Sequence, residues 1–346
     1  MKRIAILTDN AFTYTGREAV CSFMTKVYSN KNEVDIISLS GEGEPFHDFS
    51  GAKLIKTFLG KSYPLYSALR FMKKKEYDYI FTVSMGKLSV LTSIYKFLFL
   101  WSKSTRFIAC EHISYNSLKK PQKIIKSVLL RNFHKVVVLT DIDRDIYTKH
   151  NVNVIKIENP LNYKNITRTK RYYNILAVGR LSSQKNFAEL LDIWSEFKKN
   201  DDKYKLTILG DGDERQILEQ KILSLGLNDS VELKGKVNNI NFYYELSDIC
   251  LMTSKYEGLP MVLLEAKSWS IPSIAYDCPT GPKEIIVDNF DGFVIEQYNR
   301  KKYLEMLFTL TRNDDVFFRM TNNTKASSAR FSSDKISLQW NKLIRG

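Results

Sequence analysis

The sequence predicts an α/β protein made of two doubly wound, Rossmann-like domains. A chain of 346 residues suits two domains, and short apolar segments alternate with helical patterns in each half. Such alternation is typical of largely parallel sheets with helices on both faces. The predicted strands lie near residues 2–8, 33–39, 78–83, 105–110, 135–140 and 153–157 in the first half, and near 173–179, 204–210, 230–235, 248–253, 272–276 and 291–295 in the second.

The best division between the two halves follows Pro160. The residues from Glu158 to Pro160 and the polar stretch after them are typical of a connection between domains. We therefore expect an N-terminal domain at 1–160, a linker at 161–172 and a C-terminal domain at 173–331.

The composition indicates a soluble enzyme. No apolar run approaches the ~18 residues that a transmembrane helix needs, and the apolar start of the chain is too short for a signal peptide. The four cysteines lack the spacing of a metal site, and buried free thiols in a reducing compartment explain them. The four cysteines are Cys21, Cys110, Cys250 and Cys278. Because free thiols suit a reducing compartment, we expect a cytoplasmic location.

The segment from Glu257 to Glu265 is the most informative in the chain. Pro260 suits the first turn of a helix, where its missing N–H costs nothing. A helix that starts there puts Glu257 in the preceding loop and Glu265 in the second turn. The amides of Met261, Val262 and Leu263 would then point out of a helix N-terminus, which favours an anion. Two carboxylates would flank a phosphate site, although surface helices also carry paired glutamates by chance.

A second phosphate-binding element precedes this segment. The predicted strand at 173–179 ends in Gly179, and a loop with Arg180 and Lys185 leads into a helical pattern. A strand, a loop with cations and a helix start form the usual phosphate site of α/β proteins. Each cation alone could be an ordinary solvated side chain. The two elements together make that explanation much weaker.

These pieces resemble the family-4 retaining glycosyltransferases of the GT-B type, which build bacterial capsules, O-antigens and glycolipids. The resemblance spans roughly residues 170–295, with the pieces in the expected order. It is carried by Gly179 to Leu181 with Lys185 and Asn186, Leu209 to Gly212, Val231 to Gly235, Glu257 to Ala266, and Asp277 to Ile286. It implies a GT-B fold, in which two Rossmann-like domains face each other across a cleft. It also implies that a final helix at 332–346 returns to the N-terminal domain.

The resemblance implies a metal-independent hexosyltransferase that takes its sugar from a UDP-sugar donor and needs no cofactor. Arg180 and Lys185 would stabilise the departing diphosphate, Glu257 would hold donor-sugar hydroxyls, and Glu265 would hold the ribose hydroxyls. The candidate catalytic residues are His112, Arg180, Lys185 and Glu257. The candidate donor-binding residues are Gly16, Gly179, Arg180, Lys185, Lys236, Val237, Glu257, Gly258, Leu259, Met261, Val262 and Glu265.

The N-terminal half gives weaker signals for the site. The family often has a glycine pair after its first strand, but Thr15 replaces the first glycine here, so only Gly16 matches. A flexible turn explains Gly16 equally well. His112 follows the fourth predicted strand, where relatives often carry a histidine near the reacting carbon. The alternative for His112 is an ordinary polar residue at a strand end.

The excess positive charge lies in one region. Residues 51–140 carry 17 Lys and Arg but only 3 Asp and Glu, whereas the two signs cancel in the rest of the chain. Three stretches hold most of this charge: Lys73 to Lys75, Lys96 to Lys103, and 119–135, where Ile124, Val128 and Leu129 share one predicted helix side with lysines around them. Basic amphipathic helices suit an anionic membrane surface. A solvated basic face is the alternative, and no motif supports the rival interpretation, nucleic-acid binding.

The sequence favours transfer of a hexose or N-acetylhexosamine to a glycan or lipid-linked acceptor in cell-surface polysaccharide synthesis. The protein would work in the cytoplasm, peripherally at the inner face of the membrane. The alternatives are an epimerase of similar fold and a non-catalytic partner in polysaccharide assembly. UDP-glucose, UDP-galactose and their N-acetyl counterparts suit the site better than GDP-mannose.

Overall fold

The computed structural model describes residues 1–345 except 14, 100, 103, 162–163 and 165. It divides into two compact units, residues 1–160 with 333–346, and residues 161–332. Leu100 and Lys103 of the second basic stretch, part of the expected linker and Gly346 lie outside the described residues.

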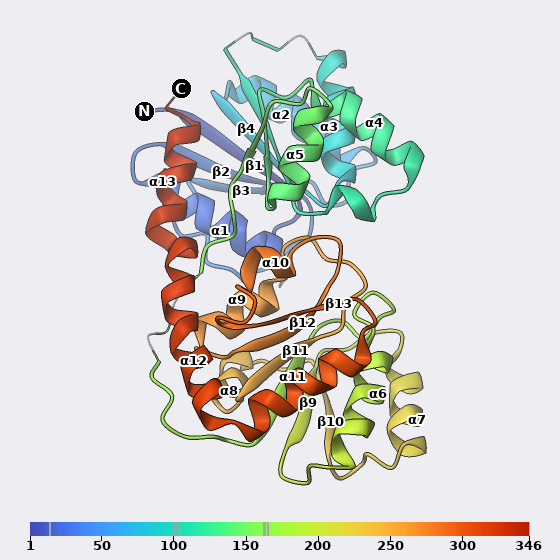
Figure 1. The fold of residues 1–346 in the computed structure, drawn as a ribbon. Helices are drawn as coiled ribbons and strands as arrows, with labels where there is room; N and C mark the ends of the chain where they lie inside the picture. The colour runs from blue at the N-terminus through green and yellow to red at the C-terminus, as the bar shows by residue number, and fades with distance from the viewer. Residues whose placement is uncertain (14, 100, 103, 162–163, 165, 346) are drawn as a thin grey trace. The chain divides into compact units, whose positions relative to one another are not determined.

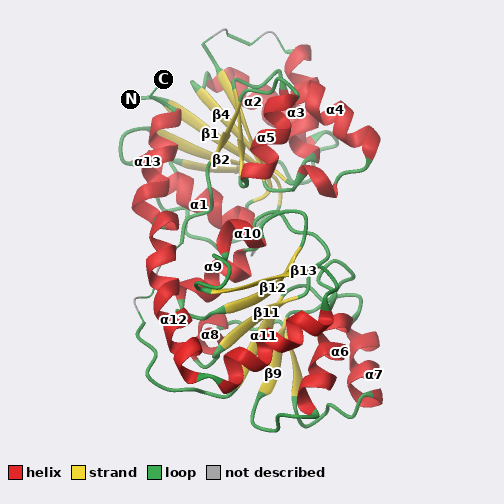
Figure 2. Ribbon diagram, viewed as in Figure 1, coloured by secondary structure: helices red, strands yellow, loops and turns green. Residues whose placement is uncertain are grey.

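The first unit is a seven-stranded parallel sheet with helices on both faces (Figures 1 and 2). The strand order is β3-β2-β1-β4-β5-β6-β7. The strands are β1 (Arg3–Asn10), β2 (Glu33–Ser40), β3 (Leu54–Thr57), β4 (Tyr79–Ser84), β5 (Arg106–Glu111), β6 (Lys135–Val138) and β7 (Val154–Lys156). The helices are α1 (Gly16–Ser29), α2 (Pro64–Lys75), α3 (Lys87–Leu98), α4 (Lys120–Leu130), α5 (Asp141–Lys149) and α13 (Ser333–Leu343), with a 3₁₀ turn η1 (Tyr115–Ser117).

Strand β3 is absent from the sequence prediction. It has four residues, and it pairs in parallel with β2 at the edge of the sheet, with Leu54 opposite Asp35. Ile55 and Lys56 are exposed. A short edge strand with one covered side has neither the apolar run nor the clear alternation on which strand prediction depends.

The last helix, α13, packs into the core of the first unit. Ile336 and Trp340 are buried there. The Tyr28 hydroxyl donates a hydrogen bond of 3.0 Å to the carbonyl of Trp340, and the rings of Phe81 and Trp340 meet edge to face. The first unit is therefore assembled from both ends of the described chain.

The second unit is a six-stranded parallel sheet in the order β10-β9-β8-β11-β12-β13. One core cluster lies between this sheet and α6, α7, α11 and α12. The strands are β8 (Asn174–Val178), β9 (Lys205–Leu209), β10 (Val231–Gly235), β11 (Ile249–Met252), β12 (Ser273–Asp277) and β13 (Gly292–Glu296). The helices are α6 (Phe187–Lys198), α7 (Arg215–Ser224), α8 (Ile240–Glu245), α9 (Met261–Ser268), α10 (Pro282–Ile285), α11 (Arg300–Arg312) and α12 (Asp314–Ser328), with a 3₁₀ turn η2 (Ala329–Phe331).

The described part of the expected linker belongs to the second unit. The buried Arg168 side chain donates to the carbonyls of Trp269 (3.0 Å) and Tyr244 (2.8 Å). The amide of Leu161 donates to the carbonyl of Phe331 at 2.7 Å. The sequence missed this packing because the contacts come from residues about 80 to 170 positions later in the chain.

Both sheets reverse their direction of growth beside the first strand of the unit, between β1 and β4 and between β8 and β11. In open parallel sheets, ligands bind at such a switch point, outside the carboxyl ends of the strands. The candidate residues of the second half follow β8, β10 and β11. None of the helices in the described residues combines the length and apolar composition that a bilayer span requires.

Candidate functional site

The turn after β8 is braced by the turn after β9. The amide of Gly179 donates to Leu209 (2.9 Å), and that of Leu181 donates to Asp211 (3.2 Å). Gly210 has a φ of +128°, and a Cβ there would lie 1.9 Å from the carbonyl oxygen of Gly179. Only glycine allows this approach. Residues 209–212 are one of the segments that carry the family resemblance, and their glycines have a physical role. They allow the turn after β9 to contact the turn after β8.

Lys185 lies across Gly179 and pairs with Glu257. A Cβ on Gly179 would lie 3.0 Å from Cε of Lys185, so a larger residue would displace the lysine. The Lys185 ammonium is 2.6 Å from Oε1 of Glu257, and 18% and 8% of these two side chains are exposed. The structure thus joins two candidate residues that are 72 positions apart in the sequence.

Hydrogen bonds also join the loops that carry this pair. The Lys255 amide donates to the carbonyl of Gln184 (2.8 Å), and the Gln184 side chain donates to the carbonyl of Tyr256 (2.9 Å). The Thr253 hydroxyl donates to the carbonyl of Asn186 (3.1 Å). These loops follow β8 and β11, the strands that flank the switch point. The Lys185–Glu257 pair is therefore held by backbone contacts as well as by its own charge.

A third loop supports Glu257 from behind. The Thr280 hydroxyl donates to the carbonyl of Glu257. Gly281 has a φ of +100°, and a Cβ there would lie 2.5 Å from the carbonyl oxygen of Gly258 and 2.4 Å from Cδ of Pro260. The sequence pointed to residues 277–286 only through the family resemblance. The structure gives their role, which is to hold Glu257 and Gly258 in place.

Helix α9 starts at Met261, and Pro260 is its N-cap residue. Glu257 lies in the loop before the helix, and Glu265 falls in the second turn, as the spacing predicts. The prediction of three available amides is wrong for Leu263, whose N–H donates to the carbonyl of Pro260 at 3.1 Å. A tight first turn uses this donor internally. Leu259 is buried, whereas Met261 and Val262 are partly exposed.

Glu265 is oriented by a tyrosine that sequence reasoning missed. The Tyr244 hydroxyl donates to Oε2 of Glu265 at 2.7 Å. Burial raises the pKa of Glu265, while the hydrogen bond from Tyr244 and the positive charge of Lys185 partly offset this rise. Tyr244 lies 21 residues upstream on α8, and no motif in the sequence connects it with Glu265.

Arg180 and Lys236 are exposed. Arg180 has no carboxylate partner among the described residues, and its stem runs beside Gly212, where a Cβ would lie 3.0 Å from Cγ of Arg180. Lys236 and the partly exposed Val237 follow Gly235, whose carbonyl accepts a hydrogen bond of 2.9 Å from Gly210. All the candidates of the second unit therefore belong to one edge of its sheet.

The two candidates of the first unit lie at the carboxyl edge of their own sheet. Gly16 is the first residue of α1, and His112 follows β5, where its amide donates to the carbonyl of Ser84 at 2.9 Å. Burial lowers the pKa of His112 to about 4, and the positive charge of Arg17 contributes. The imidazole is therefore neutral near pH 7.

This edge of the first unit also carries charged residues that the sequence interpretation missed. Arg17 is paired with Asp9 (2.8 Å) and with the buried Glu18 (2.7 Å). Glu18 also accepts hydrogen bonds from the hydroxyls of Thr8 (3.2 Å) and Thr15. Charged residues at a helix start are common, so their spacing alone gave no signal.

The basic stretches of the first unit differ from one another. In α2, Leu69 and Met72 are buried, so Lys73 to Lys75 form a solvated helix end. In α3, the Lys96 ammonium donates to the carbonyl of Asn132 at 2.7 Å. Lys73 to Lys75 match the alternative of a helix that packs on the sheet and shows a solvated basic face, whereas Lys96 is bound to the backbone of a neighbouring segment.

Helix α4 departs most from the sequence prediction. Lys126, expected on its basic face, is buried, and its ammonium is 2.5 Å from the buried Glu111. Leu129 is only partly exposed, but Ile124, Ile125 and Val128 are 68%, 53% and 51% exposed. The helix thus turns one lysine inward and leaves three of its apolar side chains exposed.

The site of the second unit combines three chemical properties. The exposed Arg180 and the start of α9 favour an anion. Glu265 keeps one carboxylate oxygen, Oε1, without a partner among the described residues, and this oxygen can accept a hydrogen bond from a hydroxyl. The Lys185–Glu257 ion pair adds a cation and a second carboxylate at the same edge of the sheet. The arrangement suits a ligand that carries both phosphate and hydroxyl groups.

Comparisons with known proteins agree with this chemistry. A family model described as "Glycosyl transferases group 1" matches residues 161–327. The amylovoran biosynthesis glycosyltransferase AmsD of Erwinia amylovora is 33% identical over 357 residues, which cover 99% of this chain and 100% of that protein. A Campylobacter jejuni enzyme, named as a GalNAc-alpha-(1->4)-GalNAc-alpha-(1->3)-diNAcBac-PP-undecaprenol alpha-1,4-N-acetyl-D-galactosaminyltransferase, is 30% identical over 69% of this chain and 68% of its own.

The fold is shared with solved structures. Anabaena HepE, crystallised with UDP-glucose, has a TM-score of 0.83 and 17% sequence identity, and the match covers 100% of both chains. That likeness extends the family's two-domain fold to both units described above. The chain belongs to the group 1 glycosyl transferases, the family-4 glycosyltransferases of the GT-B fold, and is a transferase.

Proposed function

We propose that the protein is a retaining glycosyltransferase that moves a hexose or N-acetylhexosamine from a UDP-sugar to a glycan or lipid-linked acceptor in cell-surface polysaccharide synthesis. The observation that carries this proposal is the Lys185–Glu257 pair of 2.6 Å beside the exposed Arg180 and the start of α9. This pair supports the proposal because it brings positive charge and a carboxylate together at one edge of the sheet.

The printed names of relatives support the finer parts of the proposal. AmsD is named for amylovoran biosynthesis, and the Campylobacter jejuni name specifies an undecaprenol-diphosphate-linked acceptor. HepE was crystallised with UDP-glucose. A UDP-sugar donor and a lipid-linked or polymeric acceptor are therefore the substrates to test first.

Each donor group has a proposed partner at this edge. The diphosphate lies against Arg180, Lys185 and the amides at the start of α9, and the ribose hydroxyls bind Glu265. Glu257, with Gly258 and Leu259, binds the donor sugar. Gly179 provides room for Lys185, and the backbone at Lys236 and Val237 contacts the base. Gly16 and His112 belong to the proposed acceptor domain, formed by the first unit.

The main catalytic task is to stabilise charge on the leaving group. As the bond between the anomeric carbon and the diphosphate oxygen breaks, negative charge grows on the diphosphate, where Arg180 and Lys185 are proposed to act. The acceptor oxygen bonds to the same face of the anomeric carbon, and its proton passes to the departing phosphate oxygen. This step needs neither an enzymatic nucleophile nor a metal ion, so no metal and no cofactor are proposed.

A donor panel with an acceptor tests the proposal. The purified full-length protein is mixed with UDP-glucose, UDP-galactose and their N-acetyl forms, with an undecaprenyl-diphosphate oligosaccharide as acceptor. We expect acceptor-dependent release of UDP that survives EDTA, and an α-linked product from an α-linked donor. Turnover without acceptor would favour the epimerase alternative, a β-linked product would exclude retention, and loss of activity with EDTA would exclude metal independence.

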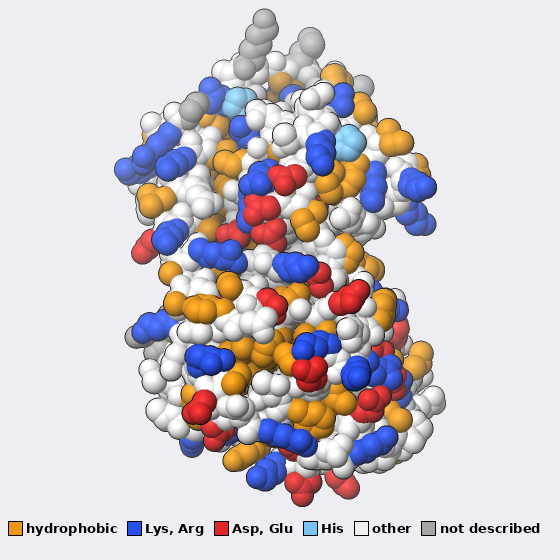
Figure 3. Space-filling view, in the orientation of Figure 1, with side chains coloured by type: hydrophobic (Ala, Val, Ile, Leu, Met, Phe, Trp, Pro, Cys, Tyr) orange, Lys and Arg blue, Asp and Glu red, His pale blue; other side chains and the backbone are white. Residues whose placement is uncertain are grey.

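We also propose that α4 docks on an anionic membrane, which would place the protein peripherally at the inner face of the cytoplasmic membrane. Ile124, Ile125 and Val128 form an exposed apolar ridge on α4, with Lys119, Lys120, Lys123 and Arg131 along the same helix. The neighbouring α3, joined to α4 by the 2.8 Å hydrogen bond from Ser93 to Leu129, exposes Ile94 and Phe97. Figure 3 shows hydrophobic and basic side chains close together in the part of the first unit where Figure 1 places α4.

This ridge suits a membrane better than water. Apolar side chains that enter the headgroup region gain burial, and each basic side chain near anionic lipid adds about 1 kcal/mol. The buried Lys126 and Leu130 hold α4 to its unit. The apolar ridge on the exposed side of the helix can therefore meet lipid. A lipid-linked acceptor would be reached at such a surface.

A further inference from the structure

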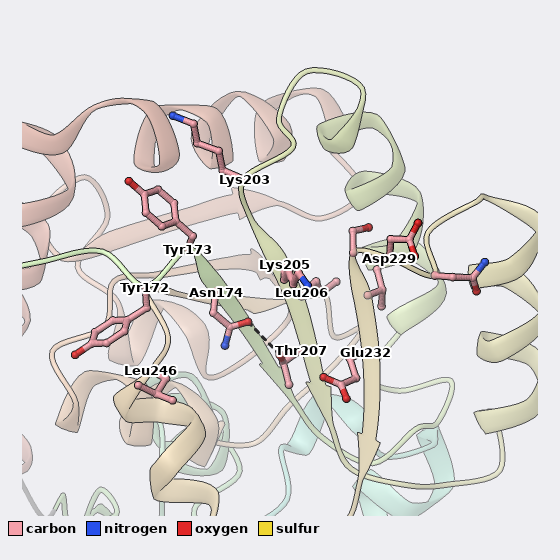
Figure 4. Close-up of a pocket in the computed structure, with 13 residues that line it drawn as sticks. Tyr172, Tyr173, Asn174, Lys203, Lys205, Leu206, Thr207, Asp229, Glu232 and Leu246 are labelled. Atoms are coloured by element: carbon pink, nitrogen blue, oxygen red, sulfur yellow. Dashed lines mark hydrogen bonds between the residues drawn. The ribbon is translucent and has the colours of Figure 1, made fainter.

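The second unit contains a cavity that the donor site does not use. Its volume is ≈ 660 Å³, within the 300–1,000 Å³ typical of small-molecule pockets. It lies at the amino ends of β8, β9 and β10, where Asn174, Lys205 and Val231 begin these strands (Figure 4). The donor loops follow the carboxyl ends of the same strands, so the cavity is at the opposite edge of the sheet.

The floor of the cavity is a polar sheet face. Thr207 of β9 is in register with Glu232 of β10, and both line the cavity. The next residue of β9, Ile208, belongs to the core beneath α6 and α7, whereas Leu206 belongs to that core and also borders the cavity. Asn174 accepts a hydrogen bond of 3.0 Å from Thr207, as the dashed line in Figure 4 shows. At this end, one face of the sheet therefore carries polar side chains that can bind polar groups, whereas the opposite face packs against helices.

Two tyrosines form a wall with an unusual backbone. Tyr173 has a φ of +56°, a left-handed conformation that is rare for a bulky aromatic residue and costs on the order of 1–3 kcal/mol. The buried Asp248 maintains it by accepting hydrogen bonds from the amides of Tyr172 (3.0 Å) and Tyr173 (2.8 Å). The Tyr173 ring meets Tyr204 edge to face and stays 45% exposed. Strain of this kind persists where the surrounding structure enforces it, and it is often found at ligand sites.

The charges of the lining indicate the class of ligand. Lys203 and Lys205 are matched by Asp229 and Glu232, so the charged side chains of the lining sum to zero. A phosphate or another polyanion would meet two carboxylates here, whereas uncharged hydroxyl groups can pair with amide, hydroxyl, ammonium and carboxylate groups alike. The exposed ring of Tyr173 adds an apolar surface for the C–H face of a sugar ring.

We propose that this cavity binds a neutral oligosaccharide of about two or three sugar rings, a size set by the volume. Its use rests on the proposed transferase function: a glycan held here has a raised effective concentration at the protein, which lowers the KM for long acceptors relative to short ones. The binding itself does not depend on that activity.

Calorimetric titration of the full-length protein tests the site. The probes are maltohexaose, cellohexaose, chitohexaose and a β-1,4-galactohexaose, with a heparin hexasaccharide as the charged counterpart. We expect at least one neutral hexasaccharide to bind, and Tyr173→Gly and Glu232→Ala each to weaken that binding about 5-fold or more. Glycine tolerates the left-handed backbone, so the first variant removes the ring without added strain.

Tyr298→Gly is the matched control. Tyr298 is in the same unit, is 58% exposed and has a φ of +66°, but it does not line the cavity. We expect unchanged oligosaccharide binding in this variant and unchanged UDP binding in all three. The proposal is overturned if no neutral probe binds, if the heparin hexasaccharide alone binds, or if both cavity variants bind as the wild type does. Hexasaccharide binding without transferase activity would instead overturn the proposed function alone.

Discussion

The cationic side chains at the carboxyl edges of the two sheets differ in how they are paired with carboxylates. In the first unit, Arg17 is paired with two carboxylates, and the buried Lys126 is paired with Glu111. In the second unit, Arg180 is exposed without a carboxylate partner among the described residues, and Lys185 is paired with the carboxylate of Glu257. The cations named at the first edge are paired with carboxylates, whereas the second edge leaves Arg180 exposed, where we propose that it meets a ligand.

Because of this difference, the net charge of a region does not predict where an anion would bind. The excess of positive charge lies in residues 51–140 of the first unit, whereas the second unit, with 24 Lys and Arg against 23 Asp and Glu, is close to neutral. The proposed anion site nevertheless lies in the second unit, where glycines bring loops together around Arg180 and Lys185. A phosphate site depends on a few oriented donors, and a net charge describes solubility and long-range attraction.

The largest effect that separates the two edges is expected in stability. Lys126→Met leaves Glu111 buried without its partner, which should cost about 3–5 kcal/mol in the free energy of unfolding. Denaturant midpoints measured by fluorescence and by circular dichroism report this loss. Lys120→Met, on the exposed side of the same helix, should change stability by less than about 0.5 kcal/mol.

A double variant checks the physical reason for that loss. Lys126→Met with Glu111→Gln removes both charges, so it should be more stable than Lys126→Met alone. If the double variant were no more stable than the single one, an unpaired buried carboxylate would not be the cause.

The next effect concerns turnover at the second edge. Arg180→Ala should lower kcat by about 2–4 kcal/mol of activation free energy, because the charge that it meets grows in the transition state. Its thermal unfolding should not change, since the side chain is exposed and without a carboxylate partner in the described part of the chain. Steady-state kinetics with a saturating UDP-sugar measure the effect.

Lys185→Ala should lower kcat similarly but also lower stability, because it removes the cation that pairs with the nearly buried Glu257. Lys199→Ala, at an exposed position after α6, is the control. Unchanged kcat in both Arg180→Ala and Lys185→Ala would contradict the assignment of the leaving-group site.

The two units also differ in how far the sequence predicted them. The strand pattern of both sheets was predicted except for β3, and the spacing of Glu257, Pro260 and Glu265 fixed the start of α9 to within a residue. These features are local, because hydrophobic periodicity and helix-start chemistry act over a few positions.

The missed features depend on contacts between distant parts of the chain. Tyr244 reaches Glu265 from another helix, and Lys126 turns inward because Glu111 ends a neighbouring strand. On a helical wheel, Lys126 belongs with the other lysines of α4, so amphipathic analysis placed this one lysine in solvent, although it is buried. A buried ion pair inverts the pattern on which such analysis relies.

A smaller effect is expected at Glu265, where stability and binding should change in opposite directions. Burial raises the pKa of Glu265 above the ordinary value of 4.5, so the folded state retains a proton that the unfolded state releases first. Stability from this group is therefore present at low pH and lost as pH rises through the raised pKa. Glu265→Gln should unfold at a higher temperature than the wild type at pH 7, and the difference should vanish below about pH 4.5.

The same substitution should weaken UDP binding by about 1.5–3 kcal/mol, because a charged acceptor of ribose hydroxyls is lost. Tyr244→Phe should keep the carboxylate but release its orientation, and weaken binding by about 0.5–1.5 kcal/mol. Calorimetry with UDP measures both. Wild-type affinity in Glu265→Gln would remove this residue from the ribose site.

The smallest effect per residue is expected on α4, where the surplus charge of the first unit should act on lipid. Flotation with phosphatidylglycerol vesicles should show binding that falls as salt is raised, because screening weakens the attraction of Lys120 and Lys123. Each lysine changed to alanine should cost about 1 kcal/mol of membrane affinity.

Ile124→Ser with Val128→Ser should reduce binding at all salt concentrations, since it removes apolar burial rather than charge. The matched control is Ile217→Ser with Leu223→Ser, which changes two similarly exposed apolar residues on α7 of the second unit and should leave flotation unchanged. Equal losses in the two double variants would mean that general surface hydrophobicity, and not the α4 ridge, holds the protein to lipid.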